Sequence, residues 1–330
     1  MNATGRVVFH RWSRMQGALR TALHRTMCVA ATPRKSDVTF TASDGFSLHG
    51  TLHGQRDDAH TALLLNSGTA IPKRFYEHFC SYAAAQGFFV LSFDYRWVGH
   101  SAPQPLNQST AVYRDWGQLD VPAAIDCLHE AAPHLPLVVV GHSTGGQQLG
   151  LSDRVSQVRA ALFVCVSTGY WQGMPWRHRL GTWLLWTVLL PVIGRLYGYF
   201  PARRFGLGES IPIGVAQEWG DWCMQPDYLA AYFDHTGRLR PRDGRAFGSQ
   251  HFADARFPIR SINFEDDPIA TAKNVPPLLA LYSNSEICTK WHRPSDVRAT
   301  SVGHLGFFRK EMKDFWQPHL DWLRMEACRK

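Results

Sequence analysis

Residues Leu135–Gly146 read LPLVVVGHSTGG and carry the strongest structural signal in the chain. The first half is a short apolar run rich in valine, which is typical of a buried strand. The second half contains GHSTG, the G-x-S-x-G spacing of a serine on a sharp turn between a strand and a helix. Gly141 and Gly145 lie where a Cβ would collide with neighbouring backbone. The pattern therefore predicts that Ser143 is a nucleophile exposed at the carboxyl end of a strand.

Apolar strands alternate with helical patterns on both sides of this elbow. We predict strands at 62–65, 88–93, 135–140 and 160–166, separated by helices at 74–85 and 116–131 and by one that begins at 147. Continuous apolar strands alternating with helices are typical of a mostly parallel sheet covered on both faces. The fold class is therefore α/β. Residues 38–53 alternate apolar and polar about Asp44-Gly45, which predicts a β-hairpin ahead of this sheet.

The alternation stops after Ser167 and resumes near residue 258. From there we predict strands at 259–264, 278–282 and 297–302, a helical stretch at 270–274 and a closing helix at 310–323. The predicted organisation is a core formed by 37–168 and 258–330, with a mainly helical cap inserted at 169–257. The insertion holds six of the twelve tryptophans, which suits a lobe that packs on the sheet and walls an apolar pocket.

Residues 1–36 form a predicted basic extension with seven Lys and Arg residues and no acid. The formal net charge of the chain is +8, so the remainder is close to neutral and gives no basic signal for a nucleic-acid partner. Three interpretations of this segment are open: a disordered extension, a targeting peptide and a surface helix on anionic lipid.

The seven cysteines are scattered and form no C-x-x-C motif. They predict reduced thiols, no zinc site and a cytoplasmic protein. Peripheral membrane binding or organelle targeting through the basic N-terminus is the alternative location.

The most apolar stretch runs from Leu180 to Gly194 and is interrupted by Pro191. It has 15 residues, whereas a bilayer span needs about 20. We therefore expect a buried helix or a lid rather than a membrane span. Peripheral contact of the cap with lipid remains an alternative.

A serine hydroxyl needs a base and a carboxylate that orients the base. After a strand–turn–helix elbow of this kind, the acid and then the histidine follow in chain order. The predicted strand 259–264 leads into Asp266 and Asp267, and His304 follows the last predicted strand. Both sites come at carboxyl ends of predicted strands, where active sites of α/β proteins assemble, and we select His304 as the base. We select Asp267 as the acid because the orienting acid in such a fold commonly precedes a short apolar pair, here Ile269-Ala270 after Pro268. Asp266 is the alternative acid, and a solvated turn is the non-functional interpretation of both carboxylates.

Two backbone amides are expected to stabilise an oxyanion at this site. The first is the amide of Thr144, at the positive end of the helix that follows the serine. The second should come from the loop 66–70 after the first parallel strand. We select Thr69 there, with Ala70 as the alternative, and Gly68 lets the backbone approach a substrate.

Several segments resemble the α/β-hydrolase superfamily, and most closely its serine-aminopeptidase-like branch with its bacterial hydrolase relatives. They are Phe75-Tyr76, Asp94–Ser101, Gly141–Gly146, Gly198–Pro201, Glu218–Cys223 and Gly303–Phe308. The resemblance extends over roughly residues 38–325 and implies a sheet of the α/β-hydrolase type and a hydrolytic mechanism. Trp97 departs from it, since relatives usually have glycine there, and we expect its indole to narrow the pocket.

The predicted function is that of a cofactor-free serine hydrolase acting on a small-molecule acyl substrate. The chain has no G-x-G-x-x-G or Walker loop and no cluster of metal-ligand spacing. The tryptophan-rich insertion favours an ester or thioester of a hydrophobic acid. Acyl transfer on the same triad, amide hydrolysis of the serine-aminopeptidase type and a non-catalytic binding protein with this fold are the alternatives.

Overall fold

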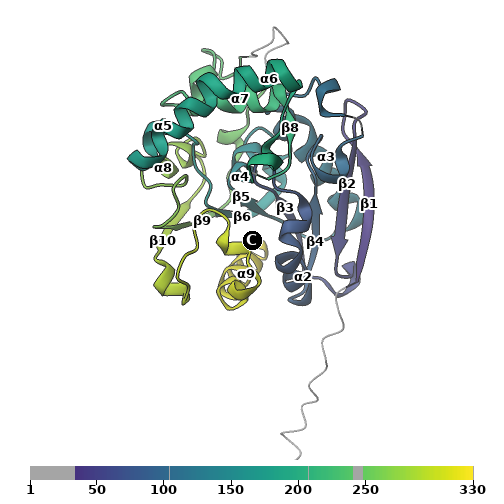
Figure 1. The fold of residues 1–330 in the computed structure, drawn as a ribbon. Helices are drawn as coiled ribbons and strands as arrows, with labels where there is room; N and C mark the ends of the chain where they lie inside the picture. The colour runs from purple at the N-terminus through teal and green to yellow at the C-terminus, as the bar shows by residue number, and fades with distance from the viewer. Residues whose placement is uncertain (1–33, 104, 207, 241–247, 330) are drawn as a thin grey trace, which may run out of the picture. The chain divides into compact units, whose positions relative to one another are not determined.

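A computed structural model describes residues 34–103, 105–206, 208–240 and 248–329. Within these residues the core is an eight-stranded sheet in the order β1-β2-β4-β3-β5-β6-β9-β10 (Figure 1). β1 and β2 form an antiparallel hairpin, β2 pairs antiparallel with β4, and all other neighbours are parallel. The strands are Lys35–Thr41 (β1), Ser47–His53 (β2), Thr61–Asn66 (β3), Phe88–Phe93 (β4), Leu137–His142 (β5), Val158–Val164 (β6), Ile259–Phe264 (β9) and Ile287–His292 (β10).

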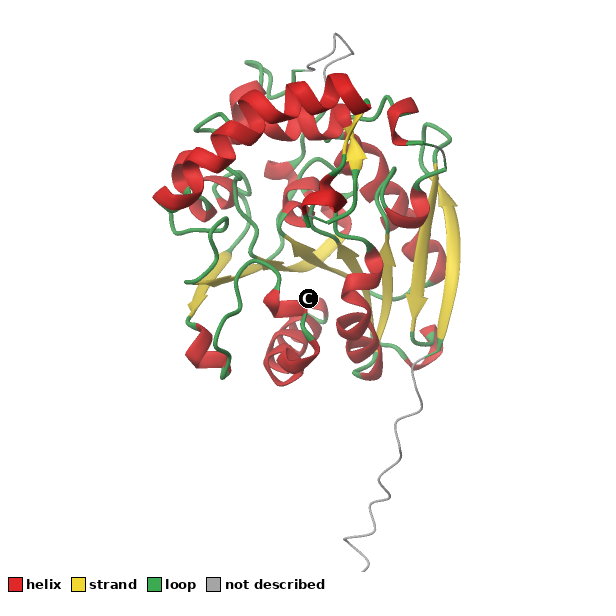
Figure 2. Ribbon diagram, in the orientation of Figure 1, coloured by secondary structure: helices red, strands yellow, loops and turns green. Residues whose placement is uncertain are grey.

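Helices cover both faces of this sheet (Figure 2). α2 and α9 lie side by side on one face, and α3 and α4 cover the other. Their bounds are Glu77–Ala85 (α2), Val121–Ala131 (α3), Thr144–Leu149 (α4) and Lys313–Ala327 (α9). Because both faces are covered, every residue of the central strands β3 and β4 is buried. The predicted parallel α/β sheet is confirmed.

The segment between β6 and β9 carries mostly helices, which lie beyond the carboxyl ends of the parallel strands (Figure 1). Its helices are Trp176–Leu184 (α5), Leu190–Tyr197 (α6) and Ile213–Cys223 (α7), and a small ladder joins Tyr199–Phe200 (β7) to Ile211–Pro212 (β8). A π-helical turn, Leu185–Leu189, joins α5 to α6, so Trp176–Tyr197 is one continuous helix of 22 residues. We refer to this 22-residue helix as the cap helix. It ends at Gly198, whose φ of +70° places it in the left-handed region.

Three predictions after residue 264 are wrong. Residues 270–274 form turns, and the predicted strand 278–282 overlaps a short helix, Val275–Leu279 (α8). Two prolines at the start of α8 fix the backbone in a helical first turn, and this outweighs the apolar run behind them. Residues 297–302 form no strand, and the last strand is β10 instead. β10 is an edge strand with half of its residues exposed and none buried, so its sequence lacks the apolar signal of a buried strand.

Most of the predicted basic extension, residues 1–33, lies outside the described residues. The structure begins at Arg34, and β1 starts at Lys35. The expected helix at 116–131 consists of a π-helical turn, Trp116–Asp120, followed by α3. The closing helix begins three residues later than predicted and reaches Ala327.

Candidate active site

Ser143 occupies a tight turn between β5 and α4, at φ +50° and ψ −114°. A non-glycine residue at this φ stores backbone strain of roughly 1–3 kcal/mol, which the surrounding packing must hold. The glycines on either side allow that packing. A Cβ on Gly145 would overlap the carbonyl oxygen of Asn66 in β3, and one on Gly141 would lie 2.8 Å from the Gly146 nitrogen. The sharp turn therefore requires both elbow glycines.

The structure brings Ser143, His304 and Asp267 into one hydrogen-bonded row. His304 Nε2 lies 2.8 Å from Ser143 Oγ, and His304 Nδ1 lies 2.7 Å from Asp267 Oδ2. With a proton on Nδ1, the ring donates to the carboxylate and its Nε2 accepts from the serine hydroxyl. Three segments far apart in the sequence thus place a hydroxyl, an imidazole and a carboxylate within hydrogen-bond reach, an arrangement that can support nucleophilic catalysis.

Asp267 is buried, and it is held in the ionised form. Burial alone would raise its pKa, but the charge and ring hydrogen bond of His304 outweigh that effect. The amides of Ile269 and Ala270 also donate to Asp267 Oδ1, at 2.8 and 3.0 Å. The pKa of this carboxyl therefore lies below its ordinary value. An ionised acid is what a histidine needs as an orienting partner.

Asp266, the alternative acid, has different partners. Its carboxylate accepts from the amides of Val302 and Gly303, at 2.8 and 3.0 Å, and from the hydroxyl of Ser301. These groups belong to the loop that carries His304. Asp266 therefore fixes the backbone of the loop, whereas Asp267 contacts the ring.

His142, the residue before the serine, ties the elbow to two other loops. The Gly68 amide donates to the Tyr76 hydroxyl at 2.8 Å, and that hydroxyl lies 2.7 Å from His142 Nδ1. His142 Nε2 lies 2.9 Å from the carbonyl oxygen of His304. Burial and the nearby His304 lower the pKa of His142 to about 3, so its ring is neutral. The neutral ring can then accept from Tyr76 and donate to the His304 carbonyl.

Tyr113 joins the two loops that were predicted to supply amides. Its hydroxyl lies 2.6 Å from Thr69 Oγ1 and donates to Thr144 Oγ1 at 2.6 Å. Burial raises the pKa of Tyr113, so the hydroxyl keeps its proton. Within the described part of the chain, the backbone amides of Thr69 and Thr144 donate to no acceptor. Tyr113 could not be found from the sequence, because no motif surrounds it and its partners come from distant segments.

A cavity of about 440 Å³ opens at this site, beneath the cap helix. Ser143, His304 and Thr69 line its floor, and most of the remaining lining is apolar or aromatic, including Ile71, Leu185, Trp186, Trp219 and Ile269. No Asp or Glu is found among its described lining residues. A larger hollow of about 670 Å³ lies between β1 and α3, but it contains none of the three residues in the row. The smaller cavity, which contains the hydrogen-bonded row, is therefore the candidate substrate site.

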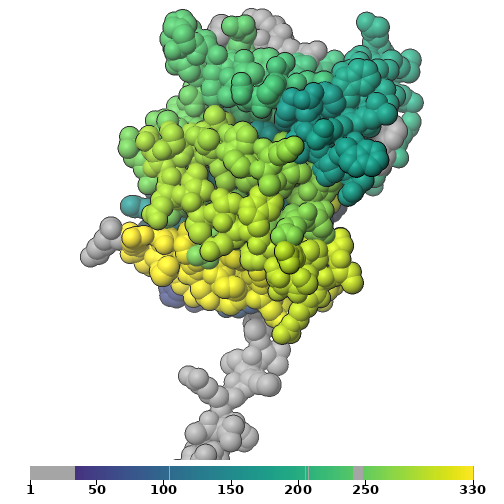
Figure 3. Space-filling view, turned by 90° about the vertical axis from the view of Figure 1, so that its left-hand side faces the viewer, coloured from purple at the N-terminus to yellow at the C-terminus, as the bar shows by residue number. Residues whose placement is uncertain are grey.

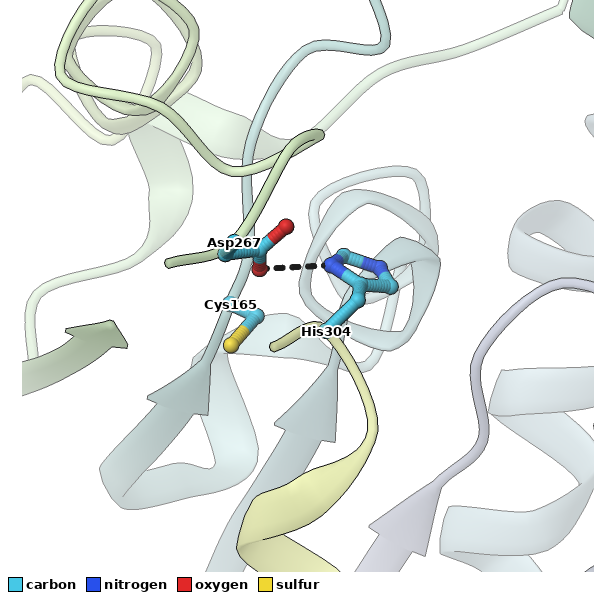
Figure 4. A group of neighbouring side chains, drawn as sticks. All are labelled: Cys165, Asp267 and His304. Atoms are coloured by element: carbon cyan, nitrogen blue, oxygen red, sulfur yellow. Dashed lines mark hydrogen bonds and ion pairs between the residues drawn. The ribbon is translucent and has the colours of Figure 1, made fainter. Parts of the chain in front are cut away.

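Cys165 lies beside the row, at the end of β6 (Figure 4). Its sulfur, an Asp267 oxygen and a His304 nitrogen all lie within 4.8 Å of one another, which is close enough for a shared metal ion. Burial and the neighbouring Asp267 raise the pKa of the Cys165 thiol well above its ordinary value. Metals bind the thiolate, and Asp267 and His304 already pair with each other. This chemistry favours a neutral thiol packed against the acid over a metal ligand.

Trp97 does not narrow the cavity, so that expectation is wrong. Its backbone has φ +65°, a conformation that suits the glycine found in relatives. The indole instead packs on Phe46, with ring centroids 5.8 Å apart, and Trp97 is not among the described residues that line the cavity.

Comparison with known proteins agrees with this architecture. Residues 57–198 match the family model described as serine aminopeptidase, S33. An alpha/beta hydrolase from a Penicillium species superposes with a TM-score of 0.52 at 15% identity, over 90% of this chain and 100% of that one. The chain adopts the α/β-hydrolase fold. This confirms the predicted resemblance to the α/β-hydrolase superfamily and to its serine-aminopeptidase-like branch.

Two further structures share this α/β-hydrolase fold. An esterase from Pyrococcus furiosus has a TM-score of 0.53 at 15% identity, over 88% of this chain and 90% of that one. An acylaminoacyl peptidase from Pyrococcus horikoshii has a TM-score of 0.52 at 11% identity, over 92% of this chain and 42% of that one. No curated protein matches the sequence. Since the fold hosts both ester and amide hydrolysis, substrate class has to be argued from the site.

Proposed function

We propose that this α/β hydrolase is a serine hydrolase that cleaves an ester or thioester of a hydrophobic acyl group. The observation that carries the proposal is the row of contacts from Ser143 Oγ to His304 Nε2 and from His304 Nδ1 to Asp267 Oδ2, at 2.8 and 2.7 Å. Ser143 attacks the acyl carbonyl while His304 takes its proton, and Asp267 holds the imidazole in the tautomer that can accept it. His304 then protonates the leaving group, and water, activated by the same ring, cleaves the acyl-enzyme.

The tetrahedral oxyanion would be stabilised by the amides of Thr144 and Thr69. The Gly68 amide is already used by the Tyr76 hydroxyl, so the next amides along the loop are the ones left for a substrate. Thr69 and Ala70 both line the cavity, but the side chain of Thr69 is the one that the Tyr113 hydroxyl joins to Thr144, which favours Thr69. Loss of one such donor typically costs about 3 kcal/mol of transition-state stabilisation.

The acyl group is proposed to occupy the apolar part of the cavity. Leu185 and Trp186 of the cap helix face Ile71 and Ile269 of the core there, so burying a hydrocarbon chain would release water from both sides. Its volume of about 440 Å³ is within the range of small-molecule sites.

Amide hydrolysis is the second candidate, and the family model described as serine aminopeptidase favours it. An aminopeptidase must recognise the free ammonium group of its substrate, for which a carboxylate is the natural partner. The described lining of the cavity has neither Asp nor Glu to meet that charge. This absence favours the ester or thioester over a peptide with a free amino terminus.

A fluorophosphonate probe tests the proposal, because it phosphonylates only a serine activated by a neighbouring base. We expect wild-type protein and Ser167→Ala to be labelled and Ser143→Ala to remain unlabelled. Ser167 lines the same cavity and serves as the matched control. A series of p-nitrophenyl esters of increasing acyl length should then give the highest kcat/KM with medium or long chains. Labelling that persists in Ser143→Ala, or cleavage of amino-acyl anilides without ester cleavage, would contradict the proposal.

A further inference from the structure

We propose that the cap helix docks on the surface of an anionic lipid bilayer, with its outer face in the headgroup region. One face of this helix is an unbroken row of exposed apolar side chains, which we call the outer stripe. The outer stripe consists of Trp176, Leu180, Trp183, Leu184, Val188, Val192 and Leu196.

The outer stripe is too apolar and too exposed for a solvated surface. Trp176 is 81% exposed, Leu180 67% and Leu196 74%. Apart from the neighbours Trp183 and Leu184, successive members lie three or four residues apart, so they share one side of the helix. Within the described residues this is also the one helix that is long and apolar enough to cross a membrane, and only 11% of its most apolar part is buried. In Figure 3 its α5 end faces the viewer at the molecular surface. A contiguous exposed apolar patch of this kind marks an interaction site.

The opposite side of the same helix faces the catalytic cavity. His178, Thr182, Leu185 and Trp186 all line that cavity. Trp186 and Leu190 are buried against the rest of the protein, and Trp186 packs on Trp219 with ring centroids 4.9 Å apart. Crossing a bilayer would pull these side chains out of the core. The helix is therefore suited to lie on a membrane, with lipid on one side and the cavity on the other.

The positive charge around the cap helix favours an anionic membrane surface. Residues 171–208 contain no Asp or Glu and five arginines, which are Arg177, Arg179, Arg195, Arg203 and Arg204. Arg177, Arg195, Arg203 and Arg204 are exposed, and of these Arg203 lies 3.9 Å from Glu209. Basic side chains beside an apolar stripe are the pattern of a helix that lies in the interface of an anionic membrane. Trp176 and Tyr197 at the two ends are residues typical of that interface.

A second copy of the chain is the competing occupant of the outer stripe. Two copies that pack stripe to stripe would bring Arg177 and Arg195 of each copy together, and the cap helix contains no acid to pair with them. Like charges at such an interface disfavour association, whereas lipid phosphates neutralise them. Charge complementarity therefore favours the bilayer.

Flotation of the full-length protein with vesicles tests the proposal. We expect binding to vesicles of phosphatidylcholine containing phosphatidylglycerol, and little binding to phosphatidylcholine alone or at high salt. The double variant Leu180→Asp with Val188→Asp should reduce bound protein at least tenfold. Met325→Asp is the matched control, since Met325 is an apolar side chain of α9 that is 62% exposed and distant in sequence. Circular dichroism and Tm should show that the variants remain folded. Replacing Arg177 and Arg195 by serine should weaken binding roughly fivefold for each arginine.

Three outcomes would overturn the inference. Unchanged binding of the double variant would assign lipid binding to another part of the chain, such as the basic residues 1–36. Failure of the wild type to float with anionic vesicles at low salt would reject the surface altogether. A stable dimer that the double variant dissociates would make a second copy the occupant. Because flotation needs no catalysis, Ser143→Ala should bind as the wild type does, so docking and the proposed hydrolysis can fail separately.

Discussion

Asp266 and Asp267 are neighbours in the sequence, yet their carboxylates hold different parts of the same loop. Asp267 Oδ2 lies 2.7 Å from the ring nitrogen Nδ1 of His304. Asp266 accepts from the backbone amides of Val302 and Gly303, just ahead of that histidine. One carboxylate therefore sets the orientation and tautomer of the ring, and the other sets the position of the backbone that carries it.

Replacing Asp267 by Asn should abolish most of the activity without unfolding the protein. An amide can donate to Nδ1 and so favour the wrong ring tautomer, with the proton on Nε2 where Ser143 needs an acceptor. We expect kcat for a p-nitrophenyl ester to fall about 10⁴-fold with little change in KM. Stopped-flow or discontinuous ester hydrolysis measures both constants.

Asp266→Ala is the comparison that separates the two roles. It removes three hydrogen bonds to the His304 loop but leaves the ring contact. Because Asp266 is exposed, we expect the free energy of unfolding to fall by only about 1 kcal/mol, and kcat by about tenfold or less. If Asp266→Ala inactivated the enzyme as completely as Asp267→Asn, the division of roles would be wrong.

Tyr113→Phe should lower kcat and leave KM nearly unchanged. The hydroxyl joins Thr69 to Thr144, the two residues whose amides are the proposed oxyanion donors. Without it, both loops remain but their spacing is less well fixed, and this costs transition-state binding more than substrate binding. We expect roughly a tenfold to hundredfold loss in kcat. Tyr82→Phe is the control, since the Tyr82 hydroxyl donates to Gln317 instead. Equal changes in both variants would leave Tyr113 with a merely structural role.

Gly145→Ala should destabilise the protein and inactivate it, because the new Cβ would overlap the Asn66 carbonyl oxygen between two central strands. Overpacking against rigid backbone typically costs about 1–3 kcal/mol, and we expect the upper end here. Gly181→Ala is the matched control in α5, where no atom lies within 4 Å of the added Cβ. Helix propensity should make that variant about 0.5–1 kcal/mol more stable. Urea unfolding of both variants measures the contrast, and equal stabilities would show that the elbow can relax.

The elbow could be predicted because its signal is local. β5, Ser143 and the start of α4 fall within a single motif, and a buried strand such as β4 is recognisable by its apolar run. Chain order then placed an acid and a histidine after the serine. The choice between Asp266 and Asp267 could not be derived from spacing alone, since it depends on which carboxylate turns toward the ring.

The errors arose where tertiary context outweighed the local pattern. β10 is half exposed at the sheet edge, so the pattern of its residues resembles that of a loop. Residues 278–282 have the apolar character of a strand but fall on and after α8, whose prolines favour a helix. Tyr113 had no sequence signal, because its role depends on two loops that only the fold brings together.

Buried histidines should make the stability of this protein fall on mild acidification. Burial lowers the pKa of His53 to about 4 and of His319 to about 3, whereas an unfolded histidine titrates near 6.5. Below pH 6.5 the unfolded chain takes up protons that the folded state refuses, so the free energy of unfolding declines as pH falls toward 4. The slope is at most about 1.4 kcal/mol per pH unit for each histidine.

His319→Leu tests this prediction. In the described structure neither ring nitrogen of His319 has a hydrogen-bond partner, so the substitution removes a titrating group without breaking a hydrogen bond. Urea unfolding between about pH 7.5 and 4.5 should show that the free energy of unfolding falls less steeply with pH in His319→Leu than in the wild type. A slope identical to that of the wild type would mean that His319 is protonated in the folded protein.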